Sequence, residues 1–167
     1  MRVTGLTARD FRNYERADVE LGERLTVIVG PNGAGKTNLL EAVYFGCTGR
    51  SPRTSNERDL LRRGATAARV TVSTADDESG EHTLEAGFQP GEPKLLRLDG
   101  SPVDNLWATD ARPLISVFLP ERLELVKGAP ASRRAHFDQL VAALWPARAV
   151  ARSAYSRALA QRNALLG

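Results

Sequence analysis

Gly30-Pro31-Asn32-Gly33-Ala34-Gly35-Lys36-Thr37 is the stretch that decides the fold, because it matches the phosphate-binding template G-x-x-x-x-G-K-[ST] at every fixed position. Residues 25–29 before it form a short apolar run with β-branched members, which predicts a strand, and residues 38–45 after it predict a helix. A glycine-rich loop between a strand and a helix lets backbone N–H groups converge on phosphate oxygens, and the helix dipole adds to the attraction. A glycine-rich turn that matches by chance is the alternative.

The residue types of this loop predict ATP and Mg²⁺ as cofactors. Lys36 is placed to reach the β- and γ-phosphates, and Thr37 supplies the first hydroxyl after the lysine, a ligand for the Mg²⁺ that bridges those phosphates. The predicted nucleotide-binding residues of this segment are Gly30, Pro31, Asn32, Gly33, Ala34, Gly35, Lys36, Thr37 and Asn38.

Length and composition are those of a globular protein. The chain has 167 residues, of which 42% are hydrophobic and 26% charged, so it suits one domain or part of a larger one. One cysteine, Cys47, excludes an internal disulfide, and its apolar surroundings predict a packed side chain. The sequence opens without an apolar signal core and contains no run long enough to cross a bilayer, which predicts a cytoplasmic protein with no membrane partner.

Positive charge is concentrated in two segments, although the net charge is only +3. Residues 50–63 carry five arginines against two acids, and residues 145–167 carry four arginines and no acid. Such runs are either solvated faces or surfaces for nucleic-acid phosphates, and the sequence leaves both readings open. The arginines are Arg50, Arg53, Arg58, Arg62, Arg63, Arg148, Arg152, Arg157 and Arg162.

The remaining pattern predicts an α/β fold. Strands are expected at residues 3–11 and 17–21, and an antiparallel meander, appended to the phosphate-loop layer, at residues 70–72, 84–88 and 95–98. Residues 46–55 predict an exposed loop, and residues 114–119 predict a buried strand. Helices follow from Pro130 to residue 144 and from Pro146 to residue 166, the first with an apolar stripe of Phe137, Leu140, Val141 and Leu144.

One element of a phosphate-loop ATPase is missing from the sequence. Such enzymes need an acidic residue at the end of a second apolar strand to hold Mg²⁺ and prepare the attacking water. The nearest candidate, Glu121, follows residues 114–119 but is displaced by Pro120. We therefore expect a nucleotide cradle without a complete hydrolytic centre, which binds ATP but does not hydrolyse it.

Three blocks of sequence resemble the family of the bacterial DNA replication and repair protein RecF. They span nearly the whole chain in the family's order, and ABC transporter ATPases in general lack both the F-R-N-Y opening and the P-x-x-R-R-x-x-F-D block. The blocks are Leu6-Thr7-Ala8-Arg9-Asp10-Phe11-Arg12-Asn13-Tyr14, the loop with the following helix at residues 30–42, and Phe118-Leu119-Pro120-Glu121 with residues 128–138.

The resemblance implies a P-loop ABC-type ATPase head related to the structural-maintenance-of-chromosomes proteins. Its mixed sheet, phosphate-loop helix and β meander would occupy residues 1–128 and lead into a helical lobe that starts at residues 129–167. The acidic strand and the signature motif of that family lie in its C-terminal half, so the sequence is expected to be an incomplete, N-terminal fragment of a longer protein.

The same resemblance implies a function in DNA repair, DNA replication and the SOS response. Members of the family would bind single-stranded DNA and gapped or single-/double-strand junction DNA, form homodimers on ATP, and act with RecO and RecR to load RecA. An ABC- or SMC-like ATPase subunit that does not act on DNA, and a small-molecule kinase, remain the alternatives.

Further site residues follow from matching the motifs. Arg12 and Asn13 would approach the nucleotide from the first strand, or else form an exposed turn pair. Glu121 would sense Mg²⁺, or else stabilise a helix N-terminus. Arg133 and Arg134 would contact DNA or a dimer partner, or else lie in a solvated first turn. The DNA-binding candidates are Arg50, Arg53, Arg62, Arg63, Arg133, Arg134, Arg148 and Arg152.

Overall fold

The structure is a computed structural model that describes residues 1–78, 80–118, 129–145 and 148–166. The chain divides into two compact units, Met1–Val117 and Phe118–Gly167. The first unit carries the phosphate loop, and the second carries the two C-terminal helices.

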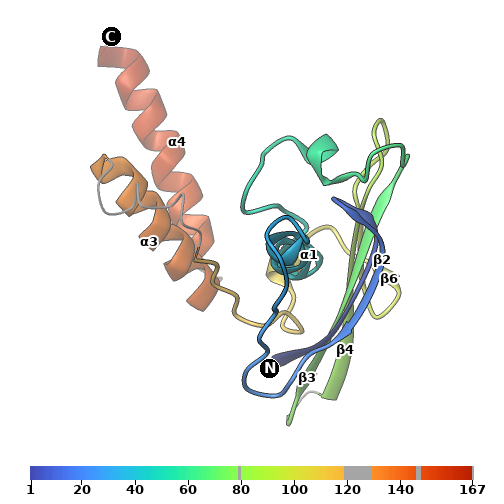
Figure 1. Cartoon of the computed structure of the whole chain (residues 1–167). Helices are drawn as coiled ribbons and strands as arrows, with labels where there is room; N and C mark the ends of the chain where they lie inside the picture. Colours follow the sequence, from blue (N-terminus) through green and yellow to red (C-terminus); the bar gives the residue numbers. More distant parts are fainter. Residues whose placement is uncertain (79, 119–128, 146–147, 167) are drawn as a thin grey trace. The chain divides into compact units, whose positions relative to one another are not determined.

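A six-stranded sheet forms the frame of the first unit (Figure 1). Its strands run in the order β2-β1-β3-β4-β5-β6, and every described pair is antiparallel. The predicted first hairpin and the meander are confirmed. The meander is no appendage, because β3 pairs directly with β1 and makes one continuous sheet. The strands are β1 (Arg2–Phe11), β2 (Tyr14–Glu20), β3 (Ala68–Asp76), β4 (Gly80–Phe88), β5 (Leu95–Leu98) and β6 (Ser101–Pro102).

Helix α1 (Lys36–Thr48) covers one face of this sheet and packs on β1, β3 and β4 (Figure 1). The predicted helix after the phosphate loop is therefore confirmed. It also runs three residues into the segment predicted as an exposed loop, where Gly46 and Cys47 are buried. Gly46 explains this closeness, because a Cβ atom at that position would lie 2.4 Å from Cγ2 of Val72 in β3. The absence of a side chain lets the end of α1 lie directly on the sheet.

The core lies between α1 and the sheet. Phe11 and Phe45, with ring centroids 5.7 Å apart, are both fully buried. Alternate residues of β3, and Leu84 and Ala86 of β4, are buried in the same core, as the period of two in a strand requires. Two short 3₁₀ helices, η1 (Glu57–Leu60) and η2 (Leu106–Ala108), each add one fully buried leucine to this core.

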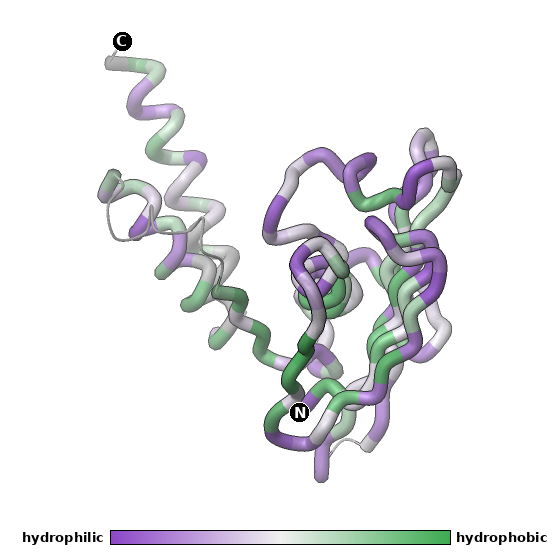
Figure 2. The backbone as a smooth tube through the Cα atoms, viewed as in Figure 1, coloured by the Kyte–Doolittle hydropathy of each residue, from purple (hydrophilic) through white to green (hydrophobic). Residues whose placement is uncertain are grey.

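Two predicted strands are not formed in this structure. Residues 25–29 and 114–118 have no strand assignment, and Leu25, Val29 and Phe118 are 80%, 83% and 89% exposed. Figure 2 colours both segments as hydrophobic. An apolar run becomes a strand only when a neighbour pairs with its backbone, and no described strand pairs with either segment. Ile28 and Ile115 are partly buried against the core, so each segment has one covered side.

The second unit contains the two predicted helices, α3 (Pro130–Leu144) and α4 (Arg148–Leu166), which contact each other. The apolar stripe expected on α3 is not buried, since Phe137 is 62% exposed and Leu140 41% exposed. One neighbouring helix is too small a surface to cover that stripe. None of the described helices combines the length and the apolar composition needed to cross a membrane.

Candidate nucleotide site

The phosphate loop is an exposed turn that ends at the first residue of α1. Gly35 caps the helix with φ of 102°, a left-handed conformation that favours glycine. Within the described residues, α1 begins with neither a side-chain cap nor an acid in its first turn. The first N–H groups of the helix and its positive dipole end therefore face the loop uncompensated, which is the arrangement that attracts an anion.

Lys36 lies over this loop. Its Nζ donates to the carbonyl oxygens of Gly30 and Pro31, at 2.8 Å each. The next residue, Thr37, is exposed in the first turn of α1. A compact positive charge is thus held at the mouth of the loop and next to free helical N–H groups, so the residues present fit a polyphosphate.

The turn between β1 and β2 contacts the phosphate loop and the start of α1 through Asn13. Asn13 Nδ2 donates to the carbonyl oxygen of Ala34 at 3.2 Å, and its Oδ1 accepts from Asn38 Nδ2 at 2.9 Å. A Cβ atom at position 35 would lie 2.5 Å from Asn13 Nδ2, so only glycine leaves room for this amide. The F-R-N-Y motif and the phosphate loop, 17 residues apart between Asn13 and Gly30 in sequence, are neighbours in the structure.

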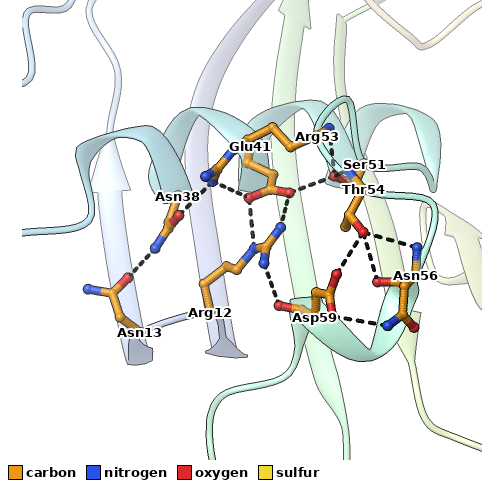
Figure 3. A network of polar contacts seen from close by, with 9 residues as sticks. All are labelled: Arg12, Asn13, Asn38, Glu41, Ser51, Arg53, Thr54, Asn56 and Asp59. Atoms are coloured by element: carbon orange, nitrogen blue, oxygen red, sulfur yellow. Dashed lines mark hydrogen bonds and ion pairs between the residues drawn. The ribbon is translucent and has the colours of Figure 1, made fainter. Parts of the chain in front are cut away.

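Arg12, from the same turn, is turned toward α1 (Figure 3). Its Nε and Nη2 donate to the two carboxylate oxygens of Glu41, at 2.9 and 2.7 Å, and its Nη1 donates to the carbonyl oxygen of Asp59 at 2.7 Å. A two-pronged guanidinium–carboxylate pair of this kind fixes position as well as charge. Arg12 is therefore anchored between the helix and the loop that follows it.

The same carboxylate holds a second arginine. Arg53 Nη1 donates to Glu41 Oε2 at 2.9 Å and to Asn38 Oδ1 at 2.8 Å. Ser51 Oγ donates to Glu41 Oε1 at 2.6 Å. Arg12, Asn13, Asn38, Glu41, Ser51 and Arg53 thus form one polar network beside the phosphate loop (Figure 3).

Glu41 is the centre of this network, and its side chain is fully buried. Burial by itself would raise the pKa of Glu41, but hydrogen bonds from Arg12 and Ser51 and the charges of Arg12 and Arg53 outweigh it, so the pKa lies below its ordinary value. Sequence reasoning missed this residue. The available signal was an acid inside a helix that is otherwise apolar from Leu39 to Phe45.

In the first unit, the predicted DNA-binding residues Arg50, Arg62 and Arg63 are not part of this network. Arg62 forms an ion pair with Asp10 at 2.7 Å. Arg50 and Arg63 are exposed, and neither has an ion pair with a described residue. Arg133 and Arg134 lie in the first turns of α3, and Arg148 and Arg152 lie at the start of α4. Glu121 lies outside the described residues.

No described group of three or more His, Cys, Asp or Glu side chains is arranged to hold a metal ion. Because Glu121 lies outside the described residues, Thr37 is the one predicted Mg²⁺ ligand whose position the structure describes.

Cys47 is fully buried, and burial raises the pKa of its thiol to about 12, while the charge of Arg112 acts in the opposite direction. The expected packed role of Cys47 agrees with this burial.

Known proteins resemble this chain over the segments that form the candidate site. Residues 6–94, which include the phosphate loop and the turn at Arg12, match the sequence profile of the AAA domain family. The DNA replication and repair protein RecF of Streptomyces avermitilis is 40% identical over 99% of this chain, and that of Cutibacterium acnes is 39% identical over 99%. The chain belongs to the AAA domain family. Over nearly its whole length it is also similar to the RecF proteins.

Solved structures give the same result. The recombination mediator protein RecF of the RecFOR pathway, determined with ATP, covers 98% of this chain with a TM-score of 0.81 and 25% identity. An SMC ATPase structure covers 83% of the chain with a TM-score of 0.66 and 23% identity, and it supports the fold alone. The predicted P-loop ABC-type ATPase fold is thereby confirmed.

The chain is shorter than the relatives that it matches. The chain spans 44% of the Streptomyces protein, 43% of the Cutibacterium protein and 44% of the solved RecF chain.

Proposed function

We propose that this chain binds Mg-ATP and supplies the nucleotide-binding part of an ATP-dependent DNA repair and replication protein. The observation that carries the proposal is the start of α1, where Lys36 and uncapped helical N–H groups face one exposed loop. The RecF structure determined with ATP, which this chain matches over 98% of its length, supports the choice of nucleotide.

The nucleotide-binding residues are those predicted from sequence. Residues 30–38 hold the phosphates, and Asn13 borders the loop through its bond to Ala34. Thr37 ligates Mg²⁺ together with the phosphate oxygens, and Glu121 is retained as a second ligand. Arg12 acts from its place on Glu41, in the second turn of α1.

We further propose that residues 1–128 are the N-terminal part of the ATPase lobe and that residues 129–167 begin the helical lobe. The acid that prepares the attacking water belongs to sequence outside these residues. The chain on its own therefore binds ATP without turning it over.

DNA is the proposed macromolecular partner, bound as single strands and as single-/double-strand junctions. Exposed arginines supply the contacts, with Arg50 and Arg63 favoured over Arg53 and Arg62 because the latter two have carboxylate partners. Arg133, Arg134, Arg148 and Arg152 are the proposed contacts of the second unit. Action with RecO and RecR, the loading of RecA, and ATP-dependent homodimerisation belong to the whole protein.

A titration with a fluorescent ATP analogue in the presence of Mg²⁺ tests the nucleotide part. Wild type should bind, and Lys36→Ala should lose binding because the cation at the loop mouth is gone. Asp10→Asn, which removes a carboxylate from the same unit outside the site, is the matched control and should bind as wild type does. Equal affinity of wild type and Lys36→Ala would refute the proposal.

The DNA part is tested by salt. Replacing Arg50 and Arg63 by glutamine should weaken binding to gapped duplex DNA and reduce the slope of log affinity against log salt by roughly 0.9 for each DNA phosphate that an arginine no longer neutralises. The order of preference between DNA sequences should stay unchanged. Unaltered affinity and slope, in these variants and in those of Arg133, Arg134, Arg148 and Arg152, would favour an ATPase subunit that does not act on DNA.

A further inference from the structure

The polar network beside the phosphate loop contains a buried acid that the proposed nucleotide chemistry does not use. Glu41 is fully buried, whereas Arg12 and Arg53 are 18% and 33% exposed at their side chains. Two guanidiniums against one carboxylate leave one net positive charge in the group formed by these three residues. Asp59 does not cancel it at close range, since the Asp59 carboxylate accepts from Thr54 and Asn56 instead.

The network joins three separate segments. Arg12 comes from the β1–β2 turn, Glu41 from α1, and Arg53 from the loop before η1, and all meet on one carboxylate (Figure 3). From Arg53 the hydrogen bonds continue through Asn38 to Asn13 and end on the carbonyl oxygen of Ala34 in the phosphate loop. A displacement of Glu41 would therefore be transmitted to the loop that cradles the phosphates.

We propose that Glu41 is a positioning residue for nucleotide binding, which holds Arg12 and Arg53 together and, through Asn38 and Asn13, fixes the shape of the phosphate loop. The inference rests on the proposed binding of ATP. It adds that the geometry set by this carboxylate matters more to the nucleotide than the charge it carries.

Geometry and charge make opposite predictions for one substitution. Glu41→Gln removes a negative charge beside a site for a polyanion, so an effect of charge alone would strengthen ATP binding or leave it unchanged. An amide accepts through one oxygen, so it cannot hold both guanidiniums as the carboxylate does, and the two arginines would repel each other. Positioning therefore predicts weaker binding in spite of the more positive site.

The test is a titration of the intact protein with a fluorescent ATP analogue and Mg²⁺, at fixed salt and at a temperature where circular dichroism shows each variant folded. Glu41→Gln should raise the Kd roughly tenfold, as expected when charge-assisted hydrogen bonds are removed. Glu41→Asp keeps the charge but shortens the reach, and it should raise the Kd by at least about twofold. If Glu41→Gln fails to fold, Glu41→Asp decides. If neither folds, Ser51→Ala decides, because it removes only the hydroxyl that donates to Glu41 and should also raise the Kd.

Asp10→Asn is the matched control. It breaks the ion pair between Asp10 and Arg62, which lies shortly after η1, and it changes no residue of the network. Asparagine also tolerates the positive φ of 48° at this position. A Kd that rises equally in Asp10→Asn would mean a general loss of stability and would overturn the inference. So would a folded Glu41→Gln that binds ATP as well as wild type. Lys36→Ala separates the two proposals, since binding that survives in that variant refutes the nucleotide site itself.

Discussion

Phe45 in α1 and Phe137 in α3 are both aromatic residues on the apolar face of a helix, yet Phe45 is fully buried and Phe137 is 62% exposed. The difference lies in what each helix meets. Within the first unit, α1 rests on a six-stranded sheet, whereas within the second unit α3 has a single described helix, α4, to pack on. An apolar stripe on a helix therefore indicates which face can be buried, and the extent of burial depends on the area of the partner surface.

The same contrast is found inside the first unit. β3 and β4 have partners on both sides, while residues 25–29 and 114–118 have no described strand beside them. Their exposed large apolar side chains are Leu25, Val27, Val29, Leu114 and Phe118. The phosphate loop leads directly from residues 25–29 into α1. Its helical end is anchored in the core, and its other end continues into an exposed segment.

The largest effect on this comparison is expected when each of the two aromatic rings is removed. Phe45→Ala should lower the free energy of unfolding by about 3–5 kcal/mol, because it leaves a cavity beside Phe11. Phe137→Ala should change it by less than about 0.5 kcal/mol, since the ring already faces solvent. Urea unfolding followed by circular dichroism measures both. Equal losses in the two variants would contradict the proposed difference between the units.

A smaller effect is expected at the contact between α1 and β3. Gly46→Ala should cost about 1–3 kcal/mol of unfolding free energy, because the new Cβ atom would lie 2.4 Å from Val72 Cγ2. Gly5→Ala is the control within the same sheet, where the nearest atoms to a new Cβ are those of Ser73, at 3.6 Å. The same unfolding assay compares them. A neutral Gly46→Ala would show that α1 does not rest as tightly on the sheet as the structure describes.

The smallest expected effect is the pH dependence that Glu41 gives to the first unit. The pKa of Glu41 is lowered in the folded state, so its ion pairs stabilise the fold fully above its ordinary pKa of 4.5 and lose that effect as the pH falls through the folded value. The difference in unfolding free energy between wild type and Glu41→Gln should therefore shrink below pH 4.5. Unfolding curves recorded at neutral pH and at several acid pH values measure it. A difference independent of pH would mean that folding does not lower the pKa of Glu41.

Local signals in the sequence were enough to predict most of the fold. Strand period, turn residues and the glycine-rich template predicted β1, the meander β3–β5, α1 and the two later helices, and the structure confirms them. The strands expected at 25–29 and 114–119 were wrong for the described residues, because pairing depends on a neighbouring strand and not on the segment itself. The predicted end of α1 was also wrong, since the helix continues to Thr48. The close approach of Gly46 to Val72 in β3 depends on the folded sheet and not on the segment itself.

The positions of some residues in the candidate site followed from the sequence. The template located residues 30–38, and the F-R-N-Y match placed Arg12 and Asn13 near them. The carboxylate that joins these segments was not predictable, because Glu41 meets Arg12 and Arg53 only after three segments have folded together. An ion pair between residues 29 positions apart in the chain, as Arg12 and Glu41 are, leaves no spacing that a single sequence reveals.

Amide hydrogen exchange with and without Mg-ATP tests the central claim, that the nucleotide binds at the start of α1, most directly. Saturating Mg-ATP should slow exchange most strongly in residues 33–39, where the uncapped N–H groups meet the phosphates, and also in residues 12–13 and 51–53 of the Glu41 network. In the Lys36→Ala variant this protection should disappear. Unchanged exchange in residues 33–39 at saturating Mg-ATP, or protection confined to residues 130–166, would contradict the account.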